Sequence, residues 1–272
     1  MVTVPRASLL GIPTELRLQI YDSLIDEDVN YAVIKRWTGG HGRDGFFTTA
    51  TRNPEARLNL PWLSAMLSCP TIAYEMRSLM RNRKEGDSKY TTHVMSAELG
   101  NGGGDVRNVT WQRLPCAPSD AEVLIIECGA ESDDFEPWGD GGPRNIVRSM
   151  YQTLNLFLHC GPRLDPTKPL PSGHVHLREL VVNVRMRGEI RQYFSMSGEP
   201  VKFTRSAYTL IRDMILRPLC YSGLLVGYAD RATISDGKEE SVMPMRTERG
   251  GVPEHWDRYG FKWGVGEVAA AR

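Results

Sequence analysis

The run from Ala121 to Cys128 constrains the fold of this 272-residue chain most strongly. Its interior, Val123-Leu124-Ile125-Ile126, is apolar at every position, which is typical of a strand buried on both faces. We therefore expect a central strand here. Strand-like patterns predict further strands before and after it in the sequence, over 31–37, 90–97, 106–114, 175–186 and 224–234.

Two long amphipathic helices are predicted among these strands. Apolar residues at helical spacing favour one helix from Asn145 to Cys160 and another from Phe203 to Leu219. Because helices precede strands and the strands then alternate with these two helices, the expected class is α+β. In detail, we expect N-terminal helices packed on a mixed, mainly antiparallel sheet, with the two long helices on one face.

The stretch from Leu9 to Ile25 predicts an N-terminal helix that is unusually apolar, with Pro13 suited to its first position. One apolar stripe consists of residues at helical spacing: Ile12, Leu16, Ile20 and Leu24. Further apolar residues widen this stripe: Leu18, Tyr21 and Ile25. The remaining polar positions are expected to face solvent: Arg17, Gln19 and Asp22. A short helix this apolar must be buried against the rest of the chain, a partner, or both.

The motif Leu9-x-x-Ile12-Pro13-x-Glu15-Leu16-x-x-x-Ile20-x-x-x-Leu24 resembles the first helix of an F-box, with Ile12 in place of the usual leucine. The sequence of residues 12–21 is similar to the corresponding sequence in the F-box-like proteins of filamentous fungi. In F-box proteins this helix packs on a Skp-type linker protein, which connects to a cullin ubiquitin ligase. The resemblance therefore implies partner-binding residues in this chain: Leu9, Leu10, Ile12, Pro13, Leu16, Ile20 and Leu24.

The rest of the F-box-like region departs from the common pattern. Residues 38–59 are rich in glycine, proline and basic residues, so we expect a loop there. Helical spacing predicts two more helices, over 61–69 and 70–83. In an F-box two helices follow the first closely, whereas here about 35 residues intervene. We expect either a helical region over 1–84, with an inserted loop over 38–60, and an α+β region over 85–272, or one fused body.

The apolar residues of helix 13–25 occupy more than one stripe, so we expect one face to stay partly open. Within this helix, Leu16 and Ile20 are expected to be core residues, whereas Leu10 and Pro13 at its entry would contact the linker. Six residues discriminate between core helix and docking helix, because their complete coverage by the chain itself would weaken the docking interpretation: Leu16, Leu18, Ile20, Tyr21, Leu24 and Ile25.

Charge and cysteine content exclude several function classes. Lysine plus arginine equals aspartate plus glutamate at 33 each, which removes the electrostatic argument for bulk nucleic-acid or membrane-surface binding. No run of apolar residues is long enough to span a membrane, and no secretory signal is visible. The five cysteines are scattered and odd in number, without a CxxC pair. We therefore expect reduced thiols in a cytoplasmic or nuclear protein.

Three patterns suggest chemistry, but each lacks a necessary part. Gly100 to Gly104 is rich in glycine like a phosphate loop, yet it lacks the Lys-Ser/Thr pair and a following helix. His174 and His176 would share one strand face as metal ligands do, with Glu179 the only close candidate to complete a site. His159-Cys160 are adjacent on a helix and cannot face each other. We therefore expect no cofactor, no metal and no enzymatic activity.

Two function classes remain. The first is a non-enzymatic protein–protein adaptor, in which the F-box-like helices bind a Skp-type linker and the α+β body recruits an unknown target. The second is a stand-alone binding or structural protein that has lost linker binding, its N-terminal helices being core. A polar tail from Ser235 carries four aromatic residues, which either fasten it to the core or form an exposed patch: Trp256, Tyr259, Phe261 and Trp263.

Overall fold

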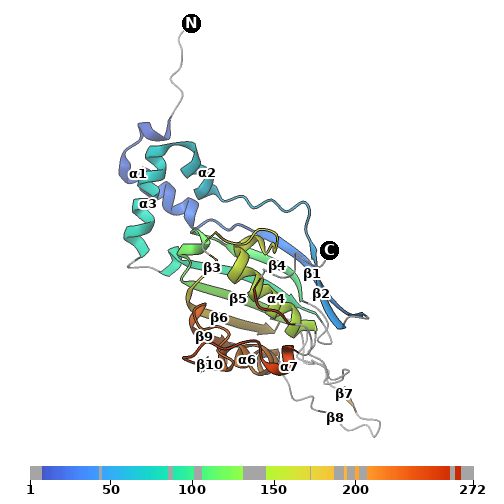
Figure 1. Ribbon diagram of the computed structural model, residues 1–272. Helices are drawn as coiled ribbons and strands as arrows, with labels where there is room; N and C mark the ends of the chain where they lie inside the picture. Colours follow the sequence, from blue (N-terminus) through green and yellow to red (C-terminus); the bar gives the residue numbers. More distant parts are fainter. Residues whose placement is uncertain are drawn as a thin grey trace.

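One large sheet carries helices on one face and a unit of three helices at one end, as the computed structural model in Figure 1 shows. The expected α+β class is confirmed, with one mixed sheet of eight strands and a separate two-stranded sheet. The structure describes residues 8–42, 45–84, 88–100, 106–130, 145–171, 173–186, 193–194, 200–201, 207–257 and 261–264.

The large sheet has the strand order β10-β9-β6-β5-β3-β4-β1-β2, so that β5 lies near its centre as expected. Parallel pairing joins β3 to β5, β5 to β6 and β6 to β9, and the other neighbouring pairs are antiparallel. The strands are β1 (Tyr31–Gly42), β2 (Gly45–Arg52), β3 (Thr92–Leu99), β4 (Val106–Arg113), β5 (Val123–Ala130), β6 (Leu177–Met186), β9 (Ala229–Ser235) and β10 (Glu240–Met243). The short strands β7 (Tyr193–Phe194) and β8 (Pro200–Val201) pair with each other.

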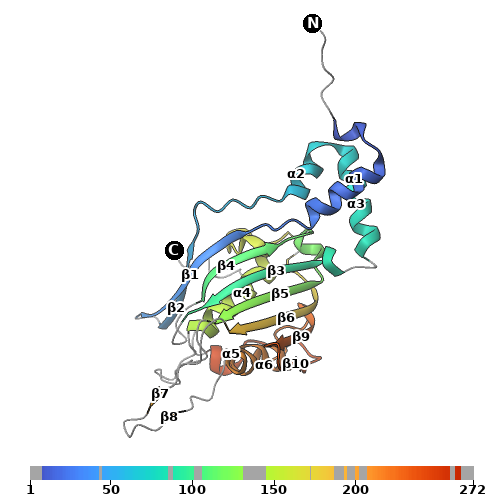
Figure 2. The ribbon, with the colours of Figure 1, turned by 180° about the vertical axis from the view of Figure 1, so that it is seen from behind.

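Both helical connections between parallel strands lie on the same face of the sheet. Helix α4 (Asn145–Cys160) connects β5 to β6, and the segment α5 (Ala207–Ile211), η6 (Arg212–Leu216, π-helical) and α6 (Arg217–Tyr221) lies between β6 and β9. Connections of this kind between parallel strands are right-handed. Because each parallel strand is added on the same side of the previous one, in the order β3-β5-β6-β9, both helical connections lie on one face of the sheet. Figure 2 shows the opposite face, where no described helix crosses β3, β5 or β6.

The C-terminal tail covers the outer side of α4. The ring of Tyr151 on α4 lies 5.3 Å from that of Trp256, 4.8 Å from Phe261 and 5.6 Å from Trp263. Trp256 belongs to the short helix α7 (Glu254–Asp257). These contacts confirm that the aromatic residues fasten the tail to the core, although Tyr259 lies outside the described residues. They also explain why α4 is buried on its outer side as well as against the sheet.

Two glycines let the tail cross the turn that follows α6. The backbone N–H of Gly250 donates to the carbonyl of Gly223 at 3.1 Å. Gly223 has a φ of +74°, which favours glycine. A Cβ on Gly250 would lie 1.6 Å from the carbonyl oxygen of Ser222, so only glycine fits this crossing.

The three-helix unit comprises α1 (Thr14–Ile25), α2 (Pro61–Ser68) and α3 (Pro70–Lys84), preceded by the 3-10 turn η1 (Leu9–Gly11). The helices expected over 61–69 and 70–83 are thus confirmed. The chain passes between this unit and the sheet three times: from α1 to β1, from β2 to α2, and from α3 through η2 (Ser88–Tyr90) to β3. The unit has its own hydrophobic cluster, separate from the main core: Tyr21, Ile25, Trp62, Ile72, Met76, Leu79 and Tyr90.

Two expectations about local structure were wrong. The loop expected over 38–60 is part of a β-hairpin through residue 52, because residues 38–42 of β1 pair with residues 45–49 of β2. The last parallel strand begins at Ala229 rather than at Leu224, because residues 222–228 form turns. The second long helix is confirmed from Ala207 and continues to Tyr221, two residues beyond its expected end, while residues 203–206 lie outside the described part.

Candidate functional site

Exposed apolar side chains concentrate on the three-helix unit. Of the eight large hydrophobic residues that are exposed in the described part of the chain, six belong to this unit and two to the body. The six are Leu10, Leu16, Ile20, Leu63, Leu67 and Tyr74. Leu67 and Tyr74 are the most exposed, at 79% and 73%. Because single exposed hydrophobic residues are ordinary on protein surfaces, the concentration on one small unit is the informative feature.

The buried residues of helix α1, and those that face solvent, differ from the expected ones. Arg17, Tyr21 and Ile25 are buried, whereas Leu16 and Ile20 are 49% and 39% exposed. Successive residues are rotated by about 100° around a helix axis. The centre of the three buried residues and the centre of the two exposed ones are therefore about 120° apart around α1. The expectation that Leu16 and Ile20 are core residues is therefore wrong, and so is the expectation that Arg17 faces solvent. The expected partly open face is confirmed.

A polar network fixes this orientation of α1. One edge of the Arg17 guanidinium group donates two hydrogen bonds to the Glu75 carboxylate of α3, at 3.0 Å from Nε to Oε2 and 2.5 Å from Nη2 to Oε1. Arg17 also donates to the carbonyl of Ile12 at 2.6 Å, and the Tyr21 hydroxyl donates to Glu75 Oε2 at 2.8 Å. The hydrogen bonds from Arg17 hold the pKa of Glu75 below its ordinary value. This bidentate pair holds Arg17 toward α3, and the neighbouring Leu16 faces outward.

None of the sequence-predicted partner residues is buried. Leu10, Pro13, Leu16 and Ile20 are exposed, and the other three are half-buried: Leu9, Ile12 and Leu24. The six discriminating residues are not all covered by the chain, because Tyr21 and Ile25 are buried while the remaining ones are half-buried or exposed. The helix begins at Thr14, with Pro13 as the preceding cap residue rather than the first helical residue.

Specific contacts connect the three-helix unit to the sheet. The indole Nε1 of Trp62 on α2 donates to the carbonyl of Leu114, just after β4, at 2.7 Å. Asp26, directly after α1, lies 3.6 Å from the guanidinium of Arg113 and 3.9 Å from the Lys89 ammonium. The Tyr90 hydroxyl of η2 donates to the Asp22 carboxylate of α1. The unit is therefore held against the body by one buried indole and by a set of charged contacts.

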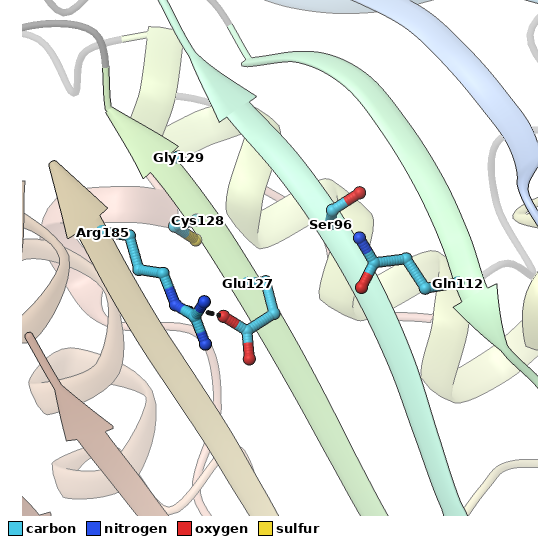
Figure 3. Close-up of a pocket in the computed structure, with 6 residues that line it drawn as sticks. All are labelled: Ser96, Gln112, Glu127, Cys128, Gly129 and Arg185. Carbon is cyan, nitrogen blue, oxygen red and sulfur yellow. Dashed lines mark ion pairs between the residues drawn. The ribbon is translucent and has the colours of Figure 1, made fainter. Parts of the chain in front are cut away.

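The uncovered sheet face is polar where β3, β5 and β6 approach their carboxyl ends. Glu127 accepts a hydrogen bond from Asn183 at 2.9 Å and forms an ion pair with Arg185 at 3.1 Å (Figure 3). Gly129 carries no side chain on this face, and a shallow depression of about 190 Å³ opens beside it. Its lining residues are Ser96, Gln112, Glu127, Cys128, Gly129 and Arg185. Figure 3 shows the Glu127 and Arg185 side chains directed toward each other.

The residues considered for metal or nucleophilic chemistry lie in structural settings. His176 contacts Asp230 at 3.2 Å, and the ring of His174 lies 4.8 Å from that of Tyr228. His159 contacts the Asn155 carbonyl and the Tyr228 hydroxyl, and burial raises the pKa of the Cys160 thiol to about 11. Among the described residues, no three His, Cys, Asp or Glu side chains converge as a metal site would require. The glycines expected to form a turn lie largely outside the described part, at 101–104.

His93 on β3 has a fully buried side chain. Its Nε2 donates to the Cys116 carbonyl at 3.2 Å, its Nδ1 has no hydrogen-bond partner among the described residues, and its ring meets those of Trp111 and Phe157 edge-on, at 6.1 and 6.0 Å between ring centres. Burial lowers its pKa from 6.5 to about 4, so the folded protein holds the neutral ring.

We expect His93 to make folding stability dependent on pH. Between pH 6.5 and 4 the unfolded chain binds a proton at this ring that the folded chain does not. The free energy of unfolding that depends on His93 is therefore highest above pH 6.5. It falls by roughly 1.4 kcal/mol per pH unit as the pH drops toward 4. Urea unfolding of the wild type and of His93→Leu across this range measures the difference in slope. Parallel curves would contradict the assignment.

Among the described residues, no helix is both long enough and apolar enough to span a membrane. No protein-family model, no curated protein and no solved structure matches the chain.

Proposed function

We propose that this protein is a non-enzymatic adaptor of the cytoplasm or nucleus, whose three-helix unit binds a Skp-type linker of a cullin ubiquitin ligase and whose α+β body recruits a target protein. One observation carries the proposal. The unit that contains the F-box-like motif is also the unit where six of the eight exposed large hydrophobic residues lie. A concentration of exposed apolar side chains on one unit supports a protein interaction site there.

The orientation of α1 supports a docking role for this helix. Leu16 and Ile20 belong to the motif, and both face away from the core that Tyr21 and Ile25 help to form. The pair of Arg17 and Glu75 holds this arrangement through contacts within the chain itself. A partner would therefore meet a preorganised surface, which lowers the entropic cost of binding.

Changing Leu16 and Ile20 together to serine is expected to abolish linker binding while leaving the fold intact. Loss of a hot-spot side chain costs 2 kcal/mol or more, which is about 30-fold in affinity, and two such losses exceed the range of a pull-down. Stability should change little, because both residues are exposed. Pull-down with purified Skp-type linker and thermal denaturation measure the two effects.

The matched control is the pair Tyr221→Ser and Val242→Ser. These residues are the two exposed large hydrophobic residues of the body, at 54% and 51% exposure. The control should bind the linker like the wild type. Absence of linker binding by the unmodified protein, or equal binding by both double variants, would refute the proposal and leave the stand-alone protein as the better interpretation.

A further inference from the structure

A cavity of about 410 Å³ lies between the C-terminal tail and the turn that follows α6. Leu224 lines it from the turn, and the tail contributes residues 249–252 and 261–263 together with Asp257. The volume falls within the range of small-molecule sites, about 300–1,000 Å³. None of the lining residues belongs to the three-helix unit, so the cavity is separate from the surface proposed to bind the linker.

Contacts with α4 and with the turn hold Trp263, which lines this cavity, in place. The backbone N–H of Gly264 donates to Asn155 Oδ1 at 2.8 Å, and Asn155 Nδ2 donates to the Gly264 carbonyl at 3.3 Å. The Trp263 ring lies 5.4 Å from that of Tyr228 and 5.5 Å from that of His159. Because contacts within the chain already position this ring, a ligand would meet a preformed wall, which lowers the entropic cost of binding.

The cavity combines apolar walls with an unpaired polar group. Four of its lining side chains are apolar: Leu224, Val252, Phe261 and Trp263. The indole Nε1 of Trp263 is buried and has no hydrogen-bond partner within the described part of the chain. A buried donor without a partner is unfavourable. These walls therefore favour a flat apolar ligand that also carries hydrogen-bond acceptors.

Arg249 and Asp257 bring opposite charges to the same cavity. The guanidinium carbon of Arg249 lies 6.0 Å from the centre of the Tyr228 ring. Across the described residues, neither Arg249 nor Asp257 forms a side-chain ion pair, whereas Lys262, which also lines the cavity, has a contact of its own. A guanidinium group binds a carboxylate through two parallel hydrogen bonds, and an ionised carboxylate can only accept them. A matching ligand therefore has a carboxylate for Arg249 and a donor for Asp257.

We propose that this cavity binds a small aromatic carboxylate that also carries a hydroxyl group. The aromatic ring would pack on Phe261 and Trp263, since aromatic rings pair in offset or edge-to-face arrangements. The carboxylate would accept hydrogen bonds from Arg249, and the hydroxyl would donate to Asp257. Ligands with several negative charges, such as nucleotides, fit less well because Asp257 would repel them.

The proposal does not rest on the proposed function, and its test needs no linker. Isothermal titration calorimetry of the full-length chain would compare 6-hydroxy-2-naphthoate with two relatives. One is 2-naphthoate, which lacks the hydroxyl, and the other is 2-naphthol, which lacks the carboxylate. We expect saturable binding of 6-hydroxy-2-naphthoate, and weaker binding of each relative by about fivefold or more, because each loses one charge-assisted hydrogen bond.

Two substitutions assign the polar contacts. Arg249→Gln should weaken binding of both carboxylates by about fivefold or more and leave 2-naphthol unchanged. Its matched control is Arg246→Gln, because Arg246 is an exposed arginine of the same tail that does not line the cavity. Asp257→Ala should remove the preference for 6-hydroxy-2-naphthoate over 2-naphthoate.

A third substitution fills the cavity. Gly251 lines it, and a Cβ at this position would meet no atom within 4 Å, so Gly251→Phe should abolish binding without unfolding the chain. Gly11 has equally open surroundings outside the cavity, and Gly11→Phe should bind like the wild type. Thermal denaturation followed by circular dichroism checks that every variant is folded.

Three results would overturn the proposal. The first is no saturable binding of 6-hydroxy-2-naphthoate up to about 1 mM. The second is equal affinity of the Arg249 and Arg246 variants, and the third is wild-type affinity of Gly251→Phe. The double variant Leu16→Ser and Ile20→Ser separates this proposal from the proposed function, because it should lose the linker and keep the wild-type affinity for 6-hydroxy-2-naphthoate.

Discussion

Gly250→Ala is expected to destabilise the protein by roughly 3 kcal/mol, which corresponds to about 6–12 °C in melting temperature. The new Cβ would lie 1.6 Å from the Ser222 carbonyl oxygen and 2.8 Å from its carbon, and these backbone atoms cannot rotate away as a flexible side chain can. The tail must therefore leave the turn after α6. Trp256 and Phe261, which are 1% and 4% exposed, would then lose their contacts with Tyr151.

The neighbouring glycine provides the control for this prediction. A Cβ on Gly251 would meet no atom within 4 Å, so Gly251→Ala should change stability by no more than about 0.5 kcal/mol. Thermal denaturation followed by circular dichroism and by tryptophan fluorescence measures both variants. Equal stabilities of the two alanine variants would show that the tail does not need the close crossing at Gly250.

Trp62→Ala is expected to cost about 3–5 kcal/mol, because it removes a large side chain that is only 6% exposed. The same change deprives the Leu114 carbonyl of its indole donor. Trp62 lies in the hydrophobic cluster of the three-helix unit and makes the buried hydrogen bond to the sheet. Its loss should therefore loosen the unit from the body as well as weaken the unit itself.

Two further variants separate packing from hydrogen bonding in this prediction. Trp62→Phe keeps a buried ring but leaves the Leu114 carbonyl without the indole, which should cost about 1–3 kcal/mol. Leu63→Ala changes the adjacent residue, which is 38% exposed, and should cost about 0.5 kcal/mol or less. Urea denaturation would give these differences. A Leu63 variant as unstable as Trp62→Ala would contradict the arrangement of α2.

Residue periodicity was sufficient to locate the regular elements that are buried along their length. Helix α4 begins and ends at the expected residues, because its apolar positions repeat at helical spacing and Gly161 follows directly. The hairpin β1–β2 was mistaken for a loop beyond Trp37. Its outer half contains glycines and threonines, a composition typical of loops, although residues 38–42 pair in register with residues 45–49.

The orientation of α1 could not be predicted from its own residues. Apolar side chains occupy several faces of this helix, so their spacing alone does not select the inner one. The selection depends on Arg17 and Tyr21 meeting Glu75, a residue 58 positions further along the chain than Arg17. No short-range signal connects these positions.

The chain passes between the three-helix unit and the sheet three times, and this limits how the protein can be truncated or recombined. A cut after Lys84 would remove β1 and β2 together with the helices, and β4 would become an edge whose unpaired backbone groups invite association with other strands. Gene recombination that replaced the helices would likewise have to carry two strands of the larger sheet with them. The three-helix unit and the body can therefore diversify only together, and neither is a module that a single recombination event could exchange.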